Sequence, residues 1–132
     1  CGGSIGQGLP LAVGASLAKP DRPVITLHGD GGAMYTLQAL WTQARENLNI
    51  TNIIFSNRSY EILKIELDRV QAIETGDRAA SMFSLDNPPI NWCKLSESMG
   101  VPAYNPKTVK EFTDFFNKSI NEPGPSLIEL NV

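Results

Sequence analysis

The feature that most constrains the fold is an alternation of short apolar runs with segments of helical spacing. Runs short and apolar enough to be strands buried on both faces of a sheet occur at 24–27, 53–55 and 126–130. Apolar residues recur at helical spacing over 9–17, 37–48, 92–99 and 109–120. Strands alternating with helices indicate an α/β domain with a mainly parallel sheet. We expect three layers, with helices on both faces of the sheet.

The stretch 68–89 interrupts this alternation. It shows little periodicity and contains Gly76 and two prolines. Connections of this length without regular structure are uncommon and are often binding loops or mobile segments. We expect a mobile segment here, between a short helical piece at 60–67 and a short strand at 101–104.

Length and composition limit the classes of protein to which the chain can belong. Its 132 residues are the size of one domain, and its net charge of −3 does not suit a nucleic-acid groove or an anionic membrane as partner. No apolar run reaches the ~20 residues of a membrane span. Cys1 and Cys93 lack metal-site spacing, so we expect reduced thiols and a cytoplasmic protein. Because the chain has no initial Met and opens inside a glycine cluster, we expect a fragment.

Two loops carry the residues with the most distinctive chemistry. Asp30 lies among glycines directly after the run 24–27, and Asn57 and Ser59 follow the run 53–55. Adjacent parallel strands would bring Asp30 and Asn57 together at the carboxyl edge of the sheet, where ligands bind in such folds. Carboxylate, amide and carbonyl oxygens suit Mg²⁺ that also holds phosphates, and glycine N–H groups suit a phosphate. Taken alone, however, Gly-Asp-Gly is also common as an ordinary strand-to-helix turn.

Other glycine motifs do not fit. A dinucleotide fingerprint requires a third glycine, but Leu11 and Met34 stand at the required positions. Neither glycine cluster is followed by Lys-Ser or Lys-Thr, so a P-loop is excluded as well.

The motif Gly29-Asp30-Gly31, followed by 25 residues and then Asn57, resembles the cofactor motif of thiamine diphosphate enzymes. The lead-in from Gly3 to Pro10 and the ending from Gly124 to Glu129 are similar to the C-terminal domain of one group among them. That group comprises acetolactate synthase, benzoylformate decarboxylase and pyruvate decarboxylase. The resemblance implies the thiamine-diphosphate-binding fold, with residues 1–132 as the domain of a three-domain subunit that binds the diphosphate and Mg²⁺.

The resemblance also implies particular roles around the metal. Asp30, the side chain of Asn57 and the backbone carbonyl of Ser59 would bind Mg²⁺. The cofactor's diphosphate would contact the glycine loop and backbone N–H groups, at Gly29, Gly31, Gly32 and Tyr60. Many relatives have Ser at the position of Gly32, and Asn at that of Ser56; neither departure removes a metal ligand.

Three further positions are implied at the other end of the cofactor and at the substrate. The carbonyl of Gly3 would accept from the 4′-amino group, and Ile5 would hold the cofactor in its bent form. Leu63 and its neighbours would border the substrate pocket. His28 is read as a structural histidine at the pocket edge, with a proton-transfer role as the alternative.

The implied reaction is decarboxylation of a 2-oxo acid, after which the resulting enamine is transferred or protonated. We favour an acetolactate-synthase-like enzyme; the alternatives are an aryl or alkyl 2-oxo acid decarboxylase and a non-catalytic cofactor-binding or assembly module. No catalytic residue is expected in this chain, because the activating glutamate of the family lies on an N-terminal pyrimidine-binding domain of the same or a partner subunit. The resemblance further implies a homodimer or tetramer, and leaves open the 2-oxo acid and any FAD.

Overall fold

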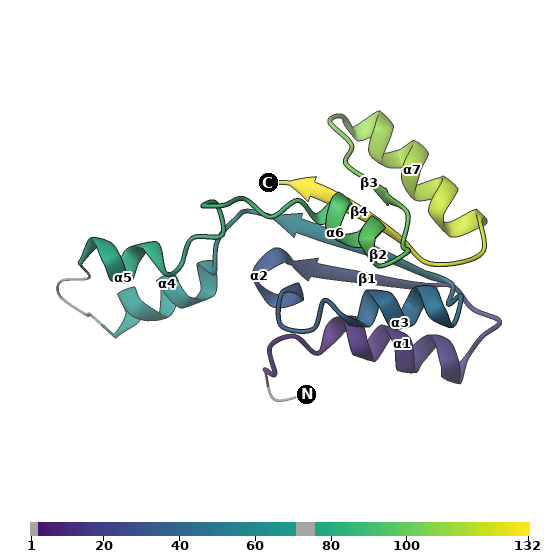
Figure 1. Cartoon of the computed structure of the whole chain (residues 1–132), viewed down its shortest axis with the longest axis horizontal. Coiled ribbons are helices and arrows are strands. Elements are labelled where there is room, and N and C mark those ends of the chain that lie inside the picture. Colours follow the sequence, from purple (N-terminus) through teal and green to yellow (C-terminus); the bar gives the residue numbers. More distant parts are fainter. Residues whose placement is uncertain (1–2, 71–75) are drawn as a thin grey trace.

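The computed structural model describes residues 3–70 and 76–132, and a parallel four-stranded sheet forms its centre (Figure 1). The strands are β1 (Val24–Gly29), β2 (Ile50–Ser56), β3 (Ala103–Tyr104) and β4 (Ser126–Asn131). They lie in the order β1-β2-β4-β3, and all pairs are parallel. The expected α/β class is thus confirmed.

Helices cover both faces of this sheet. On one face lie α1 (Gly8–Ala18), α3 (Ala39–Arg45) and α6 (Trp92–Ser98). On the other face α7 (Val109–Asn121) packs over β2 and β4 (Figure 1). The main core lies under the first group, where Leu9, Leu40 and Trp92 pack with Ile54 and Leu127. The predicted three-layer arrangement is confirmed.

Strand β2 begins three residues earlier than the apolar run indicated. Thr51 and Asn52 are polar, yet both are buried. The amide of Asn52 donates to Oε1 of Gln43 at 2.7 Å and to the carbonyl of Ser126 at 2.9 Å, so its burial leaves these groups paired. Because Thr51 and Asn52 are polar, the apolar run did not indicate the start of the strand.

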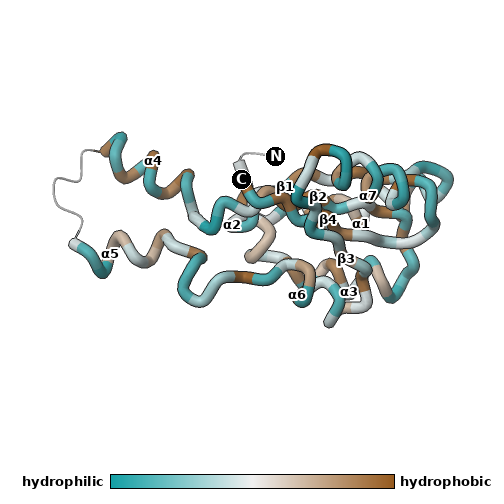
Figure 2. The backbone as a smooth tube through the Cα atoms, turned by 90° about the horizontal axis from the view of Figure 1, so that it is seen from above, coloured by the Kyte–Doolittle hydropathy of each residue, from teal (hydrophilic) through white to brown (hydrophobic). Residues whose placement is uncertain are grey.

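An arm formed by α4 (Glu61–Arg69) and α5 (Asp77–Ser81) extends away from the sheet (Figures 1 and 2). Neither helix contains a buried residue. The prediction of an irregular stretch over 68–89 is wrong in part, because α4 reaches Arg69 and α5 is helical. The five residues of α5 are too few to show a helical period. Positions 71–75 lie outside the described residues, as do Cys1 and Gly2.

Part of the sheet on the α7 side is bare. The side chains of Ile25 and Leu27 in β1 and Phe55 in β2 point to that face and are 48%, 65% and 38% exposed. Helix α7 reaches β2 and β4 but leaves β1 uncovered. An apolar sheet face of this kind is typical of a contact with another part of a protein.

Within residues 3–70 and 76–132, none of the helices has the length and apolarity required to cross a membrane.

Candidate functional site

The predicted site residues gather where β1 and β2 end. These strands are paired neighbours, with Gly29 opposite Phe55. Directly after β1 the chain enters the short helix α2 (Asp30–Ala33), which the sequence did not predict, and directly after β2 it turns at Asn57. Because both strands point the same way, the two loops meet at one edge of the sheet.

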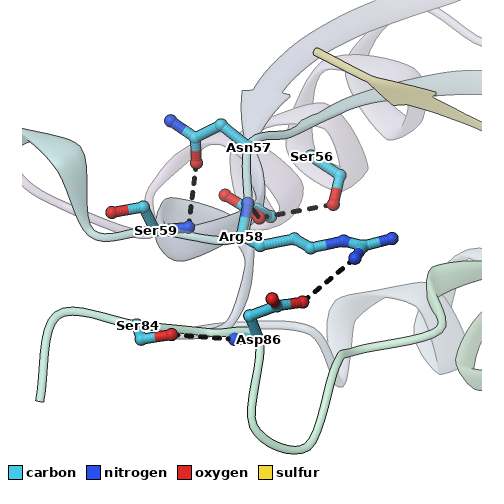
Figure 3. Close-up of polar contacts among 7 residues, drawn as sticks. Ser56, Asn57, Arg58, Ser59, Ser84 and Asp86 are labelled. Carbon is cyan, nitrogen blue, oxygen red and sulfur yellow. Dashed lines mark hydrogen bonds and ion pairs between the residues drawn. The ribbon is translucent and has the colours of Figure 1, made fainter. Parts of the chain in front are cut away.

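Asp30 is the buried anion of this site. Only 2% of its surface is exposed. One carboxylate oxygen, Oδ1, accepts from the backbone N–H of Gly31 at 2.8 Å. The other, Oδ2, accepts from the N–H of Arg58 at 2.7 Å and more weakly from the hydroxyl of Ser56 at 3.4 Å (Figure 3). Two N–H donors from two different loops therefore fix the orientation of this carboxylate.

The loop after β2 is held in a tight turn. Arg58 has a φ of 57°, in the left-handed region that residues other than glycine adopt infrequently. The side-chain oxygen of Asn57 accepts from the N–H of Ser59 at 3.0 Å (Figure 3). An amide oxygen has two lone pairs, so this bond leaves Asn57 able to bind a cation.

A close approach of backbone to an aromatic ring explains one of the glycines. A Cβ at Gly31 would lie 2.7 Å from Cδ1 of Tyr60 and 3.5 Å from the carbonyl oxygen of Ser59. The edge of Tyr60 also faces Tyr35, with ring centroids 6.4 Å apart. Any side chain at position 31 would push the two loops apart, which is why the motif requires glycine there.

A cavity of about 230 Å³ opens between these loops. Its lining includes nine of the ten sequence-predicted residues, namely Ile5, Gly29, Asp30, Gly31, Gly32, Asn57, Ser59, Tyr60 and Leu63. Gly3, the tenth, does not line it. Three residues of the lining had no assigned role: Tyr35, Glu61 and Ile62.

The sequence indicated these three further lining residues to different extents. Ile62 adjoins Leu63, whose neighbours were expected at the substrate pocket. Glu61 pairs with Lys64 at 3.3 Å, as a solvated glutamate would, but it also accepts from the hydroxyl of Ser59 at 3.2 Å and lines the cavity. Tyr35 is 54% exposed and belongs to no helical stripe, so only the fold places it here.

His28 lies beside this cavity and not in it. It lines a neighbouring hollow of about 280 Å³ together with Gly6, Gly8 and Thr36. Its Nε2 is 2.7 Å from the hydroxyl of Thr26. Burial lowers the pKa of His28 below its usual value, which favours the neutral ring. These contacts fit the structural interpretation of this histidine.

A third hollow, of about 310 Å³, lies on the far side of Arg58, between Cys93, Asn105 and Glu129. No glycine is among the residues that line this hollow. Burial and the neighbouring Glu129 carboxylate raise the pKa of Cys93 to about 11, so this thiol is protonated at neutral pH.

The donors of the cavity fit a hard divalent cation that carries a diphosphate. They comprise the carboxylates of Asp30 and Glu61, the amide oxygen of Asn57 and backbone carbonyl groups, and no cluster of three His, Cys, Asp or Glu side chains occurs in the described part of the chain. Mg²⁺ is bound in this way, by one or two protein oxygens together with substrate phosphates. A Cβ at Gly29 or at Gly32 would meet nothing within 4 Å, so the backbone at these two glycines leaves room for such a group.

Comparison with known proteins decides the family. Residues 2–130 match the model of the thiamine pyrophosphate enzyme C-terminal TPP binding domain. The chain belongs to this family. Thiamine diphosphate, with a divalent metal that is usually Mg²⁺, is the family's cofactor.

Relatives of the TPP-binding domain include two kinds of enzyme. A Mycobacterium tuberculosis protein named "Putative acetolactate synthase large subunit IlvX" is 48% identical over 132 residues, covering 99% of this chain and 26% of that protein. Benzoylformate decarboxylase of Pseudomonas aeruginosa is 34% identical over 128 residues, covering 97% of this chain and 23% of the enzyme. The chain thus spans about a quarter of the length of these relatives.

A solved structure shares the fold of this TPP-binding domain. The thiamine diphosphate-dependent 4-hydroxybenzoylformate decarboxylase of Rhodococcus jostii RHA1 superposes with a TM-score of 0.85 at 36% identity. The match covers 97% of this chain and 23% of the decarboxylase. The family model, the relatives and the solved structure therefore all agree with the resemblance that the motifs indicated.

Proposed function

We propose that this domain holds the Mg²⁺ and diphosphate of thiamine diphosphate in an enzyme that decarboxylates a 2-oxo acid. The observation that supports this most strongly is the buried Asp30, whose carboxylate is oriented by two N–H groups at the edge of a cavity that Asn57 and Ser59 also line. When bound, the cofactor supplies the electron sink for decarboxylation.

Each site residue of the domain would act by binding or orienting the metal and the cofactor. Asp30, the Asn57 side chain and the carbonyl of Ser59 would hold Mg²⁺. The N–H of Gly32 would contact the diphosphate, beside Gly29. The N–H groups of Gly31 and Tyr60, which the resemblance also assigned to the diphosphate, already donate to Asp30 and to the carbonyl of Phe83, so these two residues would border the group. Ile5, which is 53% exposed at the mouth of the cavity, presents an apolar surface against which the bent cofactor could rest, and the carbonyl of Gly3 would face its amino group.

The substrate would be a small 2-oxo acid. Ile62 and Leu63 give the cavity an apolar wall beside the metal donors, which suits an alkyl or aryl group next to a charged acid. We favour acetolactate synthesis, in line with the M. tuberculosis relative, and keep aryl or alkyl 2-oxo acid decarboxylation as the alternative, in line with the two decarboxylases. A non-catalytic cofactor-binding module is the third candidate.

The rest of the enzyme would be required for turnover. We propose that an N-terminal pyrimidine-binding domain, of the same or a partner subunit, supplies the activating glutamate in a homodimer or tetramer. The bare apolar face at Ile25, Leu27 and Phe55 supports a large contact of this kind. We also propose that the enzyme acts in the cytoplasm, without nucleic-acid or membrane partners.

The test uses the full-length protein that contains this chain, with thiamine diphosphate and Mg²⁺. CO₂ release is measured with pyruvate and with benzoylformate, and the products are identified. Acetolactate from pyruvate supports the favoured function, and benzaldehyde from benzoylformate supports the decarboxylase. Mg²⁺-dependent cofactor binding without CO₂ release from any 2-oxo acid would support the non-catalytic cofactor-binding module. Absence of cofactor binding would contradict all three candidate functions.

A further inference from the structure

The loop after β2 is fastened to a second segment that comes much later in the chain. We call residues 57–60 the β2 loop and residues 83–86 the strap. Ser59 and Ser84 form an antiparallel bridge. The N–H of Tyr60 donates to the carbonyl of Phe83 at 2.9 Å, and the N–H of Leu85 donates to the carbonyl of Arg58 at 2.7 Å. The strap therefore closes the base of the α4–α5 arm against the β2 loop.

Arg58 connects the strap to the buried carboxylate. Its N–H donates to Asp30, its carbonyl accepts from Leu85, and its guanidinium pairs with Asp86 at 3.0 Å (Figure 3). All three kinds of polar group of this residue are thus engaged, on two sides of the loop. The left-handed backbone of Arg58 is what allows its N–H and carbonyl to serve both sides.

The strap is itself held in shape near Asp86. The N–H of Asp86 donates to the hydroxyl of Ser84 at 3.2 Å (Figure 3). The hydroxyl of Ser59 is 3.3 Å from the carbonyl of Phe83. These bonds hold the backbone of the strap on either side of Ser84, and the short side chain of Asp86 pairs with Arg58 from there.

We propose that Arg58 and Asp86 are positioning residues for the Mg²⁺ site. The ion pair holds the backbone of Arg58 in the left-handed conformation in which its N–H orients Asp30 and its neighbours Asn57 and Ser59 face the cavity. Neither residue lines the cavity that would hold the metal and the diphosphate, so both would act through Asp30. This inference rests on the proposed function of the domain.

The exposure of the pair sets the size of the effect. The side chains of Arg58 and Asp86 are 49% and 58% exposed, and ion pairs this accessible contribute little in free energy. We therefore expect loss of the pair to weaken Mg²⁺ binding only about two- to fivefold. Loss of a direct metal ligand would have a much larger effect.

Two variants separate positioning from simple electrostatics. Arg58→Asn removes the cation but keeps a residue that tolerates a positive φ, and Asp86→Asn removes the anion without changing shape. A through-space charge effect would move Mg²⁺ affinity in opposite directions, since one variant removes a positive charge near the metal and the other a negative one. Positioning lowers the affinity in both.

The experiment measures the affinity of the full-length protein for Mn²⁺ as a Mg²⁺ probe, by electron paramagnetic resonance with thiamine diphosphate present. We expect both single variants to be weaker by about two- to fivefold. The double variant should be no weaker than either single variant, and the exchange Arg58→Asp with Asp86→Arg should restore part of the loss. In the cofactor-free protein, exchange of the backbone amide at position 58 should be faster in both single variants.

The matched control is Asp114→Asn, which breaks the exposed Lys110–Asp114 pair on α7. The inference would be overturned if the Mn²⁺ affinity of the two single variants changed no more than that of this control. It would also be overturned if the affinity rose in one single variant and fell in the other. If the unaltered protein binds neither Mn²⁺ nor cofactor, it is the proposed function that fails, so the two failures are distinguishable.

Discussion

Two glycines of α1 have very different surroundings. A Cβ at Gly8 would lie 2.0 Å from Cε1 of His28, whereas one at Gly14 would meet nothing within 4 Å. We expect Gly8→Ala to destabilise the protein by about 1–3 kcal/mol through overpacking, and the added change His28→Ala to recover much of it. Gly14→Ala should instead stabilise the helix by about 0.5–1 kcal/mol. Urea unfolding measures all three, and equal effects of the two alanines would show that His28 does not set the spacing.

Cys93 should be unreactive in the folded protein. Its pKa of about 11 lies above the ordinary value of 9.0, so the unfolded chain loses the thiol proton first as pH rises. The corresponding stability is present below pH 9 and is lost between about pH 9 and 11. Iodoacetamide labelling of the Cys93 peptide at pH 8.5, followed by mass spectrometry, should be at least about tenfold slower in the folded than in the unfolded protein. Equal rates would place this thiol outside the influence of Glu129.

At the scale of elements, the arm and the strap should differ in protection. Helices α4 and α5 contain no buried residue, while Tyr60 and Leu85 donate backbone bonds across the base of the arm. We expect amide exchange to be fast in α4 and α5, slower at Tyr60 and Leu85, and slowest in β2. Protection of α5 comparable to β2 would contradict the expected mobility of this region.

The sequence indicated the elements whose apolar residues show a period, and it failed where polarity or brevity hides one. Helices α1 and α7 follow from the spacing of their apolar residues, and strand β1 follows from a near-continuous apolar run. The start of β2 was missed because Asn52 is satisfied inside the sheet by Gln43 and Ser126. Helices α2 and α5 are too short to carry a period. For the cavity, the motif spacing specified Asp30 and Asn57. The position of Tyr35 at the cavity depends on how the chain folds back, and no local sequence pattern predicts that.

For the molecule as a whole, the isolated 132-residue chain should be inert and prone to self-association. Glu61 lines the same cavity as Ile5, but it pairs with Lys64 and accepts from the hydroxyl of Ser59, so no activating acid is expected here. The exposed Ile25 and Leu27 favour contact between copies. We expect no CO₂ release from pyruvate or benzoylformate. Sedimentation velocity should show oligomers that Leu27→Lys reduces, with Val109→Lys, a change at an exposed position on α7, as control. Turnover at an enzymatic rate would show that the chain contains its own activating acid.

Whether Asp30 holds the metal is tested by titration calorimetry of thiamine diphosphate, with and without Mg²⁺, into the full-length protein and its Asp30→Asn variant. The variant keeps the shape of the side chain and removes the anion that the metal requires. Circular dichroism checks that it is folded. We predict a loss of Mg²⁺-dependent affinity of about 100-fold or more, since a direct ligand should cost at least as much as a group that hydrogen-bonds directly to a ligand, whose loss costs about 10–100-fold. Affinity equal to that of the unaltered protein would show that Asp30 does not hold the metal.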